Sequence, residues 1–219
     1  MKSFSAVLFD LDGTLVDTQQ YILKAFNYAL KQQGFPPIDS KRLAEIASIP
    51  LHKCYPLLAP NGNLEKLIAD HRGFQQKNVH LVKKYPKLLE TIEALRKNNV
   101  KIAVVTSRYR KSSELSLQKT GLAKIVDALV AGDDVAESKP HPKPFTTAAQ
   151  KLGERPGNCL VVGDSCLDIV GGKAAGCKTC RAVYGYAGKE PCNQKPDFEI
   201  KSIGEALAFV QEKKQKIRQ

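Results

Sequence analysis

From Pro86 onward the sequence alternates between amphipathic helical segments and short, almost wholly apolar strand segments, and this alternation limits the fold more than any other feature. Helices are predicted at 87–98, 111–120, 143–152, 167–175 and 202–214, and strands at VKIAVVT, IVDALVA, NCLVVGD and KTCRAVY. Strands that are apolar throughout and separated by helices are typical of a parallel sheet covered on both faces. The sequence therefore predicts an α/β fold with a Rossmann-like parallel sheet core.

The segment before Pro86 follows a different pattern. AVLFD, starting near residue 6, is predicted to be a buried strand of the same sheet. Residues 18–84 hold about four amphipathic helical stretches and no convincing strand, with breaks at 34–37, 49–50 and 60–62. We expect a core domain formed by residues 1–15 and 85–219, and an inserted α-helical cap domain formed by residues 16–84.

Polar side chains follow four of the predicted strands at the points where the strands end. They are Asp10 and Asp12, then Thr106, Ser107 and Arg108, then Lys139 on a loop, and finally Asp164, Ser165 and Asp168. The carboxyl ends of parallel strands form the ligand-binding edge of such a sheet, so these groups are predicted to meet. Crowded carboxylates need a hard divalent cation, and Mg²⁺ fits phosphate chemistry best, although oxygen ligands also accept Mn²⁺ or Co²⁺. A lysine, a hydroxyl and turn amides would complete a phosphoryl-binding site.

Four sequence motifs resemble those of the haloacid dehalogenase superfamily and occur in the family's order. They are FDLDGTLVDT at 9–18, VVTSR at 104–108, SKPHPKPF at 138–145 and GDSCLDIVGGKAAG at 163–176. Together with YGYAGKEPCNQKPDFEI near the end, they look most like the group that contains phosphoglycolate phosphatases and bacterial pyrophosphatases. The resemblance implies a Mg²⁺-dependent phosphatase that hydrolyses a small, phosphoglycolate-like phosphate monoester.

The resemblance also implies roles for the two aspartates of the first motif. Asp10 would attack phosphorus and become an aspartyl phosphate, and Asp12 would protonate the leaving oxygen and then activate water. Residues i and i+2 of an extended segment face the same way, so both carboxylates can flank one phosphoryl group. Gly13 would permit the turn that follows.

The other motifs imply the metal and phosphoryl ligands. In the family pattern the metal ligands are Asp10, the main-chain carbonyl of Asp12, Asp164, and Asp168 in or just outside the coordination shell. Thr106, Ser107 and Lys139 would bind the substrate, with Lys139 also steadying Asp10.

Simpler interpretations exist for most of these residues. Asp164 or Asp168 could cap the helix that begins near Cys166, and Thr106-Ser107 could form a strand-end turn. The four histidines are too scattered for a metal site or a triad, and we assign them no catalytic role.

Other activities fit less well. Inorganic pyrophosphatase is the nearest alternative. A sugar phosphomutase would need a histidine where this chain has Ile22, a dehalogenase would lack Asp12, and a phosphonate hydrolase would need a cap lysine such as Lys53. A non-catalytic binding protein would be expected to lose a catalytic group, and none is missing.

The predicted cap would read the leaving group of the substrate. Relatives often carry glycine where this chain has Ser48 and Lys87. For this reason we do not assign the substrate of any relative to this chain. A cluster of basic residues near the motifs predicts a strongly cationic mouth that favours phosphoglycolate or pyrophosphate, unless these side chains only raise solubility. Its members are Arg108, Arg110, Lys111, Lys139 and Lys143.

Bulk properties add a few expectations. The formal charge of +12 is spread over many segments, so no nucleic-acid partner is expected, and no apolar run is long enough for a membrane helix. The six cysteines lack the spacing of a disulfide framework and are expected to be reduced thiols in a cytoplasmic protein. We expect a monomer or a homodimer.

Overall fold

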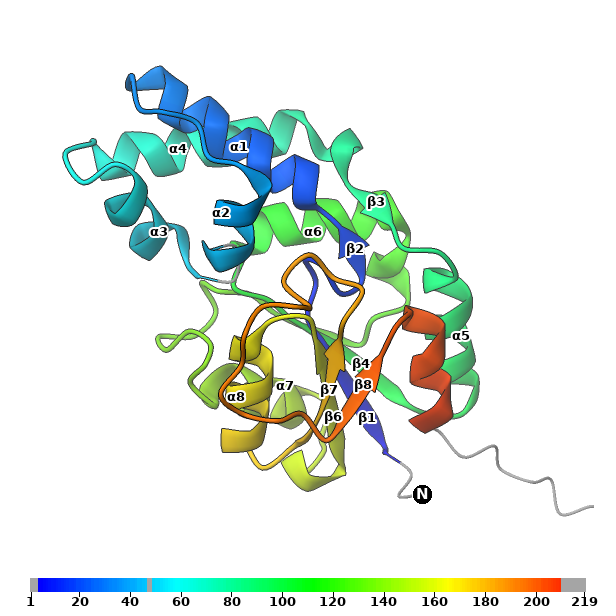
Figure 1. Ribbon diagram of the computed structural model, residues 1–219. Helices are drawn as coiled ribbons and strands as arrows, with labels where there is room; N and C mark the ends of the chain where they lie inside the picture. Colours follow the sequence, from blue (N-terminus) through cyan, green and yellow to red (C-terminus); the bar gives the residue numbers. More distant parts are fainter. Residues whose placement is uncertain (1–3, 47–48, 210–219) are drawn as a thin grey trace, which may run out of the picture.

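The computed structural model describes residues 4–46 and 49–209 and contains a six-stranded sheet in the order β5-β4-β1-β6-β7-β8. All neighbouring strands of this sheet run parallel. The strands are β1 (Ala6–Phe9), β4 (Lys101–Val105), β5 (Ala128–Val130), β6 (Cys159–Gly163), β7 (Lys178–Ala182) and β8 (Phe198–Ile200). The predicted α/β fold with a Rossmann-like parallel sheet is confirmed (Figure 1).

Helices cover both faces of this sheet. They are α5 (Leu88–Lys97), α6 (Arg110–Thr120), α7 (Lys143–Lys151) and α8 (Cys166–Ala174), with short 3-10 turns at Val79–Leu81, Leu122–Lys124, Pro156–Asn158 and Ile203–Phe209. Along β1, Ala6 and Leu8 join a core cluster with Phe145 of α7, whereas Val7 and Phe9 join the larger core on the opposite face. Successive strand residues point to opposite faces, so an all-apolar strand requires cover on both sides.

Four helices between β1 and α5 form a separate layer at one end of the molecule, which we call the helical block (Figure 1). They are α1 (Gln19–Gln32), α2 (Ser40–Ile46), α3 (Leu51–Leu58) and α4 (Leu64–Lys77). Inside the block, Tyr55 Oη lies 2.9 Å from Nδ1 of the buried His71, and Tyr21 Oη donates to the main-chain oxygen of Gln75. These buried hydroxyl and imidazole groups are therefore hydrogen-bonded, as burial favours.

A short antiparallel ribbon lies at the two ends of the helical block. It pairs β2 (Val16–Asp17) with β3 (Lys83–Lys84). The expectation of no strand within 18–84 is wrong for β3. Each strand of the ribbon is only two residues long, which is enough for pairing but too short to show an alternation of apolar and polar residues in the sequence. The ribbon brings the start and the end of the insertion to the same place.

Two further predictions differ from the structure. Strand β8 was not expected, and the helix predicted at 202–214 is a 3-10 turn over Ile203–Phe209, with its last residues outside the described ranges.

Ser48, where relatives often carry glycine, also lies outside the described residues. Lys87 adopts a left-handed backbone with φ of 62°, a conformation that suits glycine at this position.

The expectation of six reduced cysteines is wrong for two of them. Cys166 and Cys192 form a disulfide with Cα atoms 5.1 Å apart, while Cys54, Cys159, Cys177 and Cys180 are free and buried. The two cysteines are 26 positions apart, and the chain between them runs along α8, through β7 and back to the start of α8, so tertiary structure alone makes them neighbours. Among the described residues no helix is long and apolar enough to span a bilayer.

Candidate active site

Seven of the nine residues singled out at the strand ends line one small cavity, and the other two, Asp164 and Asp168, lie beside Asp10 without lining it. Its lining residues are Asp10, Asp12, Thr106, Ser107, Arg108, Lys139, Ser165 and Tyr186. The backbone explains the convergence: the N–H of Asp10 donates to Val162 of β6, and the N–H of Thr106 donates to Val130 of β5. The hydrogen-bonded register of the sheet thus continues one residue past each strand and sets these side chains at a common edge. We call this the catalytic cavity.

Lys139 lies at the base of the catalytic cavity and is almost fully buried. Its Nζ donates to Asp10 Oδ1 at 2.7 Å, to Asp168 Oδ1 at 2.6 Å and to the main-chain oxygen of Val105 at 2.7 Å. Burial opposes its charge, but the two carboxylates outweigh burial and raise the pKa of Lys139 above its usual value. All three ammonium donors are used, so the charge is held at a fixed point.

Three carboxylates form an acidic cluster beside Lys139. One oxygen from each of Asp10, Asp164 and Asp168 lies within 4.8 Å of the others. Burial, opposed by the charge of Lys139 and aided by the charges of Asp168 and Asp12, raises the pKa of Asp10 to about 7. Burial and the charges of Asp10 and Asp168 also raise the pKa of Asp164. A single lysine does not offset this much buried negative charge, so the cluster suits a divalent cation.

The walls around Asp164 fit a metal site. A Cβ at Gly13 would overlap the Asp164 carboxylate, lying 2.7 Å from its Cγ, and a Cβ at Gly185 would overlap the same side chain. The N–H of Ala187 donates to Asp164 Oδ2 at 3.0 Å. Two glycines thus leave space for the Asp164 carboxylate, and one backbone amide orients it. The cluster offers only carboxylate oxygens as ligands, which is the type of ligand that Mg²⁺ prefers.

Asp168 serves two purposes at once. Its Oδ2 accepts hydrogen bonds from the N–H and the hydroxyl of Ser165, forming a capping box at the start of α8, and its Oδ1 accepts from Lys139. The capping interpretation is therefore confirmed for this residue, whose other oxygen contacts Lys139 beside the acidic cluster. With both oxygens engaged, Asp168 is better suited to orient Lys139 than to bind a cation directly.

Asp12 points in a different direction from the acidic cluster. Its Oδ1 accepts from Thr18 Oγ1 at 2.7 Å and from the guanidinium of Arg108 at 2.9 Å. Arg108, whose side chain is only 10% exposed, also donates to the main-chain oxygen of Ser112 and to Ser116 Oγ. One carboxylate oxygen of Asp12, Oδ1, is thus engaged by both Arg108 and Thr18.

The predicted cationic mouth is wrong for three of its five members. Arg108 pairs with Asp12, and Lys139 pairs with Asp10 and Asp168. Arg110 pairs with Asp134 and Glu114. Sequence spacing shows the basic residues and the i,i+4 partner Glu114, but the other acidic partners lie in distant parts of the chain and are visible only in the folded protein.

Sequence reasoning assigned no role to the loop after β7, which closes one side of the catalytic cavity. Tyr186 lines that cavity, the N–H of Ala187 binds Asp164, and Tyr184 Oη donates to the main-chain oxygen of Thr14 at 2.7 Å. The signal available in the sequence was the aromatic and glycine-rich run YGYAG directly after a buried strand.

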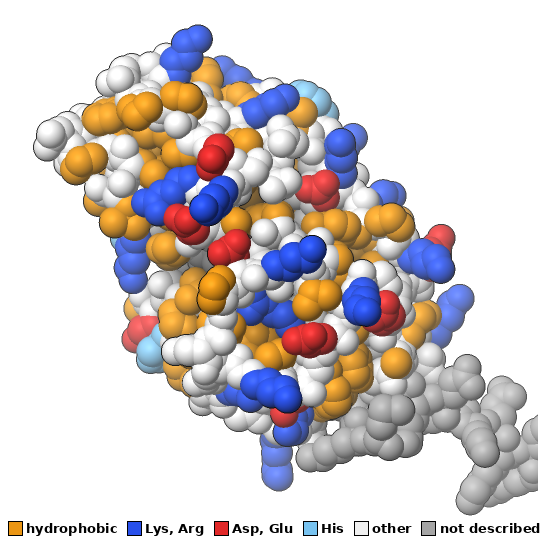
Figure 2. All heavy atoms as spheres, viewed as in Figure 1, with side chains coloured by type: hydrophobic (Ala, Val, Ile, Leu, Met, Phe, Trp, Pro, Cys, Tyr) orange, Lys and Arg blue, Asp and Glu red, His pale blue; other side chains and the backbone are white. Residues whose placement is uncertain are grey.

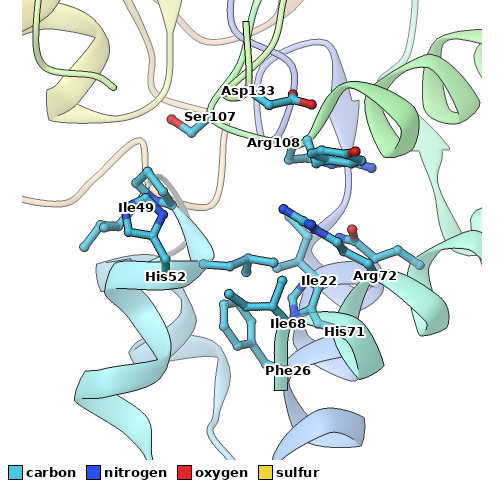
Figure 3. A pocket seen from close by; sticks show the side chains of 15 residues that line it. Ile22, Phe26, Ile49, His52, Ile68, His71, Arg72, Ser107, Arg108 and Asp133 are labelled. Carbon is cyan, nitrogen blue, oxygen red and sulfur yellow. The ribbon is translucent and has the colours of Figure 1, made fainter. Parts of the chain in front are cut away.

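A second, larger cavity of about 220 Å³ opens between the helical block and the sheet domain (Figure 3). We call it the interface cavity. It shares Ser107 and Arg108 with the catalytic cavity, so the two are contiguous. Its remaining walls come mainly from α1, α3 and α4 and from the loop at Gly132-Asp133.

Comparison with known proteins defines the class of this fold and site. Residues 7–182 match the haloacid dehalogenase-like hydrolases, and the chain belongs to that family. It is 34% identical over 210 residues to the pyrophosphatase PpaX of Bacillus cereus (strain AH820), covering 94% of this chain and 96% of the relative. The PpaX of Bacillus pumilus (strain SAFR-032) is 31% identical over 211 residues, covering 95% and 97%.

A solved structure shows the same fold. It is that of a predicted phosphoglycolate phosphatase from Haemophilus somnus 129PT, with a TM-score of 0.85 and 28% identity, covering 96% of this chain and 100% of the other. The predicted class, a hydrolase that acts on phosphate esters, is confirmed by the family membership together with these relatives.

Proposed function

We propose that this protein is a Mg²⁺-dependent phosphatase that hydrolyses a small organic phosphate monoester through an aspartyl phosphate on Asp10. The observation that supports this most is the placement of Asp10, Asp12, Thr106 and Lys139 around one cavity at the carboxyl edge of the sheet. These are a nucleophile, an acid/base, a hydroxyl donor and a fixed cation, which is the set that phosphoryl transfer through a covalent intermediate needs.

In the first step a carboxylate oxygen of Asp10 bonds to phosphorus while the bond from phosphorus to the leaving oxygen breaks. Asp12 gives its proton to that oxygen. In the second step Asp12 takes a proton from water, whose oxygen attacks phosphorus and releases phosphate from Asp10. Lys139, held 2.7 Å from Asp10, offsets negative charge throughout, and Thr106 and Ser107 donate to the phosphoryl oxygens.

A Mg²⁺ ion would be held by Asp10, Asp164 and the main-chain carbonyl of Asp12, with Asp168 in or just outside the coordination shell. When bound, it neutralises charge on the phosphoryl oxygens.

We further propose that residues 16–84 act as a cap domain on a core formed by residues 1–15 and 85–219, with the β2–β3 ribbon as the connection about which the cap moves. A cytoplasmic location and a monomeric or homodimeric state stay predictions from the sequence.

Pyrophosphatase activity is the second candidate, because the PpaX relatives bear that name. A phosphomutase is less favoured, since Ile22, in the place of the helping histidine, is a buried apolar side chain.

The test is phosphate release from a panel of phosphoglycolate, pyrophosphate, sugar phosphates, nucleotides and aryl phosphates, with Mg²⁺ and with chelator. Asp10→Asn should abolish release because an amide cannot serve as the nucleophile, and Asp12→Asn should slow it by about 10² to 10⁴. Asp39→Asn is the matched control, since Asp39 is exposed in the helical block and asparagine preserves its capping bond to Arg42. Unchanged release in Asp10→Asn, with native circular dichroism, would disprove the mechanism.

A further inference from the structure

The interface cavity has a mainly apolar lining on the side of the helical block. Figure 3 shows Ile22, Phe26 and Ile68 on this side, facing Ser107, Arg108 and Asp133 of the sheet domain. Ile49, Pro50 and Leu51, at the start of α3, extend the apolar wall. Because the cavity adjoins the catalytic cavity at Ser107 and Arg108, a leaving group attached to a phosphoryl at Asp10 would extend into it.

The size of the cavity argues against a very small leaving group. At about 220 Å³ it has room for roughly seven water molecules at about 30 Å³ each. A two-carbon group such as glycolate would leave most of this space filled with water against isoleucine, leucine and phenylalanine side chains. Water in such surroundings finds few hydrogen-bond partners, so a larger carbon skeleton is the better occupant.

Besides Arg108, two charged side chains line this space: the guanidinium of Arg72 and the carboxylate of Asp133. Among the described residues, the arginines that line the cavity are Arg72 and Arg108. Arg108 is paired with Asp12, whereas Arg72 forms no ion pair within the described part of the chain. The carboxylate of Asp133 accepts from the N–H of Arg110 at the start of α6. Burial lowers the pKa of His71 to about 3, so this histidine is neutral.

Arg72 is held in place by a contact between the helical block and the sheet domain. The centre of its guanidinium lies 4.1 Å from the centroid of the Tyr109 ring. Stacking engages the flat face of the guanidinium and leaves the N–H donors at its edge available, and its buried Nε has no hydrogen-bond partner within the described part of the chain. Arg72 therefore presents fixed, unused donors to an anion in the cavity.

We propose that the preferred substrate is a phosphate monoester whose leaving group has an apolar, ring-sized carbon body and one carboxylate at its far end. The apolar body packs against Ile22, Phe26 and Ile68, and the carboxylate binds Arg72. This inference rests on the proposed phosphatase function and narrows its substrate class. It differs from phosphoglycolate and pyrophosphate, which present charge without an apolar body.

The first test compares four substrates with the full-length protein and Mg²⁺: 4-carboxyphenyl phosphate, phenyl phosphate, phosphoglycolate and pyrophosphate. The value of kcat/KM for 4-carboxyphenyl phosphate should exceed those for phosphoglycolate and pyrophosphate by about 10-fold or more, in the range that hydrophobic pockets achieve. A preference for phosphoglycolate or pyrophosphate would overturn the inference and leave the phosphatase proposal standing. No chelator-sensitive release from any of the four would overturn both.

The second test examines Arg72 itself. Arg72→Gln should lower kcat/KM for 4-carboxyphenyl phosphate about 10-fold more than for phenyl phosphate, mainly through KM, and Arg72→Lys should restore part of the difference. Lys77→Gln, on the exposed side of the same helix, is the control and should change neither value. Equal losses on both substrates in Arg72→Gln would overturn the assignment of the carboxylate to Arg72.

The third test examines the apolar wall. Ile68→Thr keeps the branch at Cβ but replaces the ethyl arm by a hydroxyl, so it should reduce kcat/KM for both aryl phosphates more than for phosphoglycolate. Leu57→Thr is the control, because Leu57 is 59% exposed on α3 and does not line the cavity. Equal effects on all substrates in Ile68→Thr, with native circular dichroism, would show that the wall does not contact the leaving group.

Discussion

Gly13 links the catalytic loop to the acidic cluster. Its φ is +79°, in the left-handed region, and a Cβ there would overlap the carboxylate of Asp164. The sequence predicts the need for an unusual backbone at this position but not the contact with Asp164, which lies 151 residues later in the chain. The position therefore carries two separate constraints, one on the backbone and one on the space.

Gly34 makes it possible to separate these constraints, because it has a similar φ of +75° but open space around its missing Cβ. Gly34→Ala should destabilise the protein by about 1–2 kcal/mol through backbone strain alone. Gly13→Ala should cost clearly more and should also reduce phosphate release, because Asp164 must move. Urea unfolding and phosphate release measure the two effects; equal stabilities and full activity in both variants would contradict this account.

At the scale of elements, His71 of α4 is packed inside the helical block. It lies 4.7 Å, centroid to centroid, from the Phe26 ring of α1, and its Nδ1 bonds the hydroxyl of Tyr55 in α3. Burial, helped by the charges of Arg108 and Arg72, lowers its pKa to about 3. Below pH 6.5 the unfolded chain therefore takes up a proton at this residue that the folded chain does not, and stability falls with pH down to about 3.

Between pH 7.5 and pH 5.5 this proton uptake should lower the free energy of unfolding by about 1.4 kcal/mol. The contribution should be absent in His71→Gln, so the wild type should lose that much more stability than the variant over the same interval. Urea unfolding in chelator at the two pH values measures the difference. His80→Gln, at an exposed histidine, should behave like the wild type, and an identical pH dependence in His71→Gln would rule out the neutral buried histidine.

The disulfide between Cys166 and Cys192 ties the loop after β7 to the start of α8. The same loop carries Ala187, whose N–H binds Asp164, so the cross-link supports a contact of the acidic cluster. Cys192→Ser should lower the free energy of unfolding by about 2–4 kcal/mol under non-reducing conditions. Reductant should destabilise the wild type to a similar extent and leave Cys192→Ser unchanged. Six titratable thiols in the unreduced wild type would contradict this cross-link.

At the scale of the whole molecule, the surface charge is mixed. On the face shown in Figure 2, lysine and arginine side chains lie scattered among acidic and apolar ones. The most concentrated buried charge in the described residues is the acidic cluster, where Asp10 and Asp164 both have raised pKa values. A ligand that neutralises this cluster should stabilise the whole fold, because it binds the folded state alone.

Mg²⁺ at about 100 times its dissociation constant should add about 2.7 kcal/mol of stability, which raises Tm by about 5–10 °C in a chain of this size. Asp164→Asn should lose the shift, since it removes a proposed ligand, whereas the exposed control Asp39→Asn should keep it. Thermal unfolding with Mg²⁺ and with chelator checks this. A full shift in Asp164→Asn would show that the ion binds elsewhere.

The sequence by itself determined five of the six strands, the helices between them and the edge at which the site forms. Apolar strands in alternation with helices allow few arrangements that bury both faces of the sheet. The sequence therefore predicts that Asp10, Thr106, Lys139 and Asp164 lie near one another at one edge of the sheet. The resemblance of four motifs to one family narrowed the chemistry further.

Only the tertiary structure decided the partners of each charge. Arg108 forms an ion pair with Asp12, and Arg110 forms one with Asp134. The disulfide between Cys166 and Cys192 likewise joins residues that are distant in sequence. It also decided the apolar lining around Arg72, a residue to which the sequence analysis assigned no role. The physical reason is that local periodicity specifies elements, whereas distance between side chains depends on how loops and helices from separate segments pack.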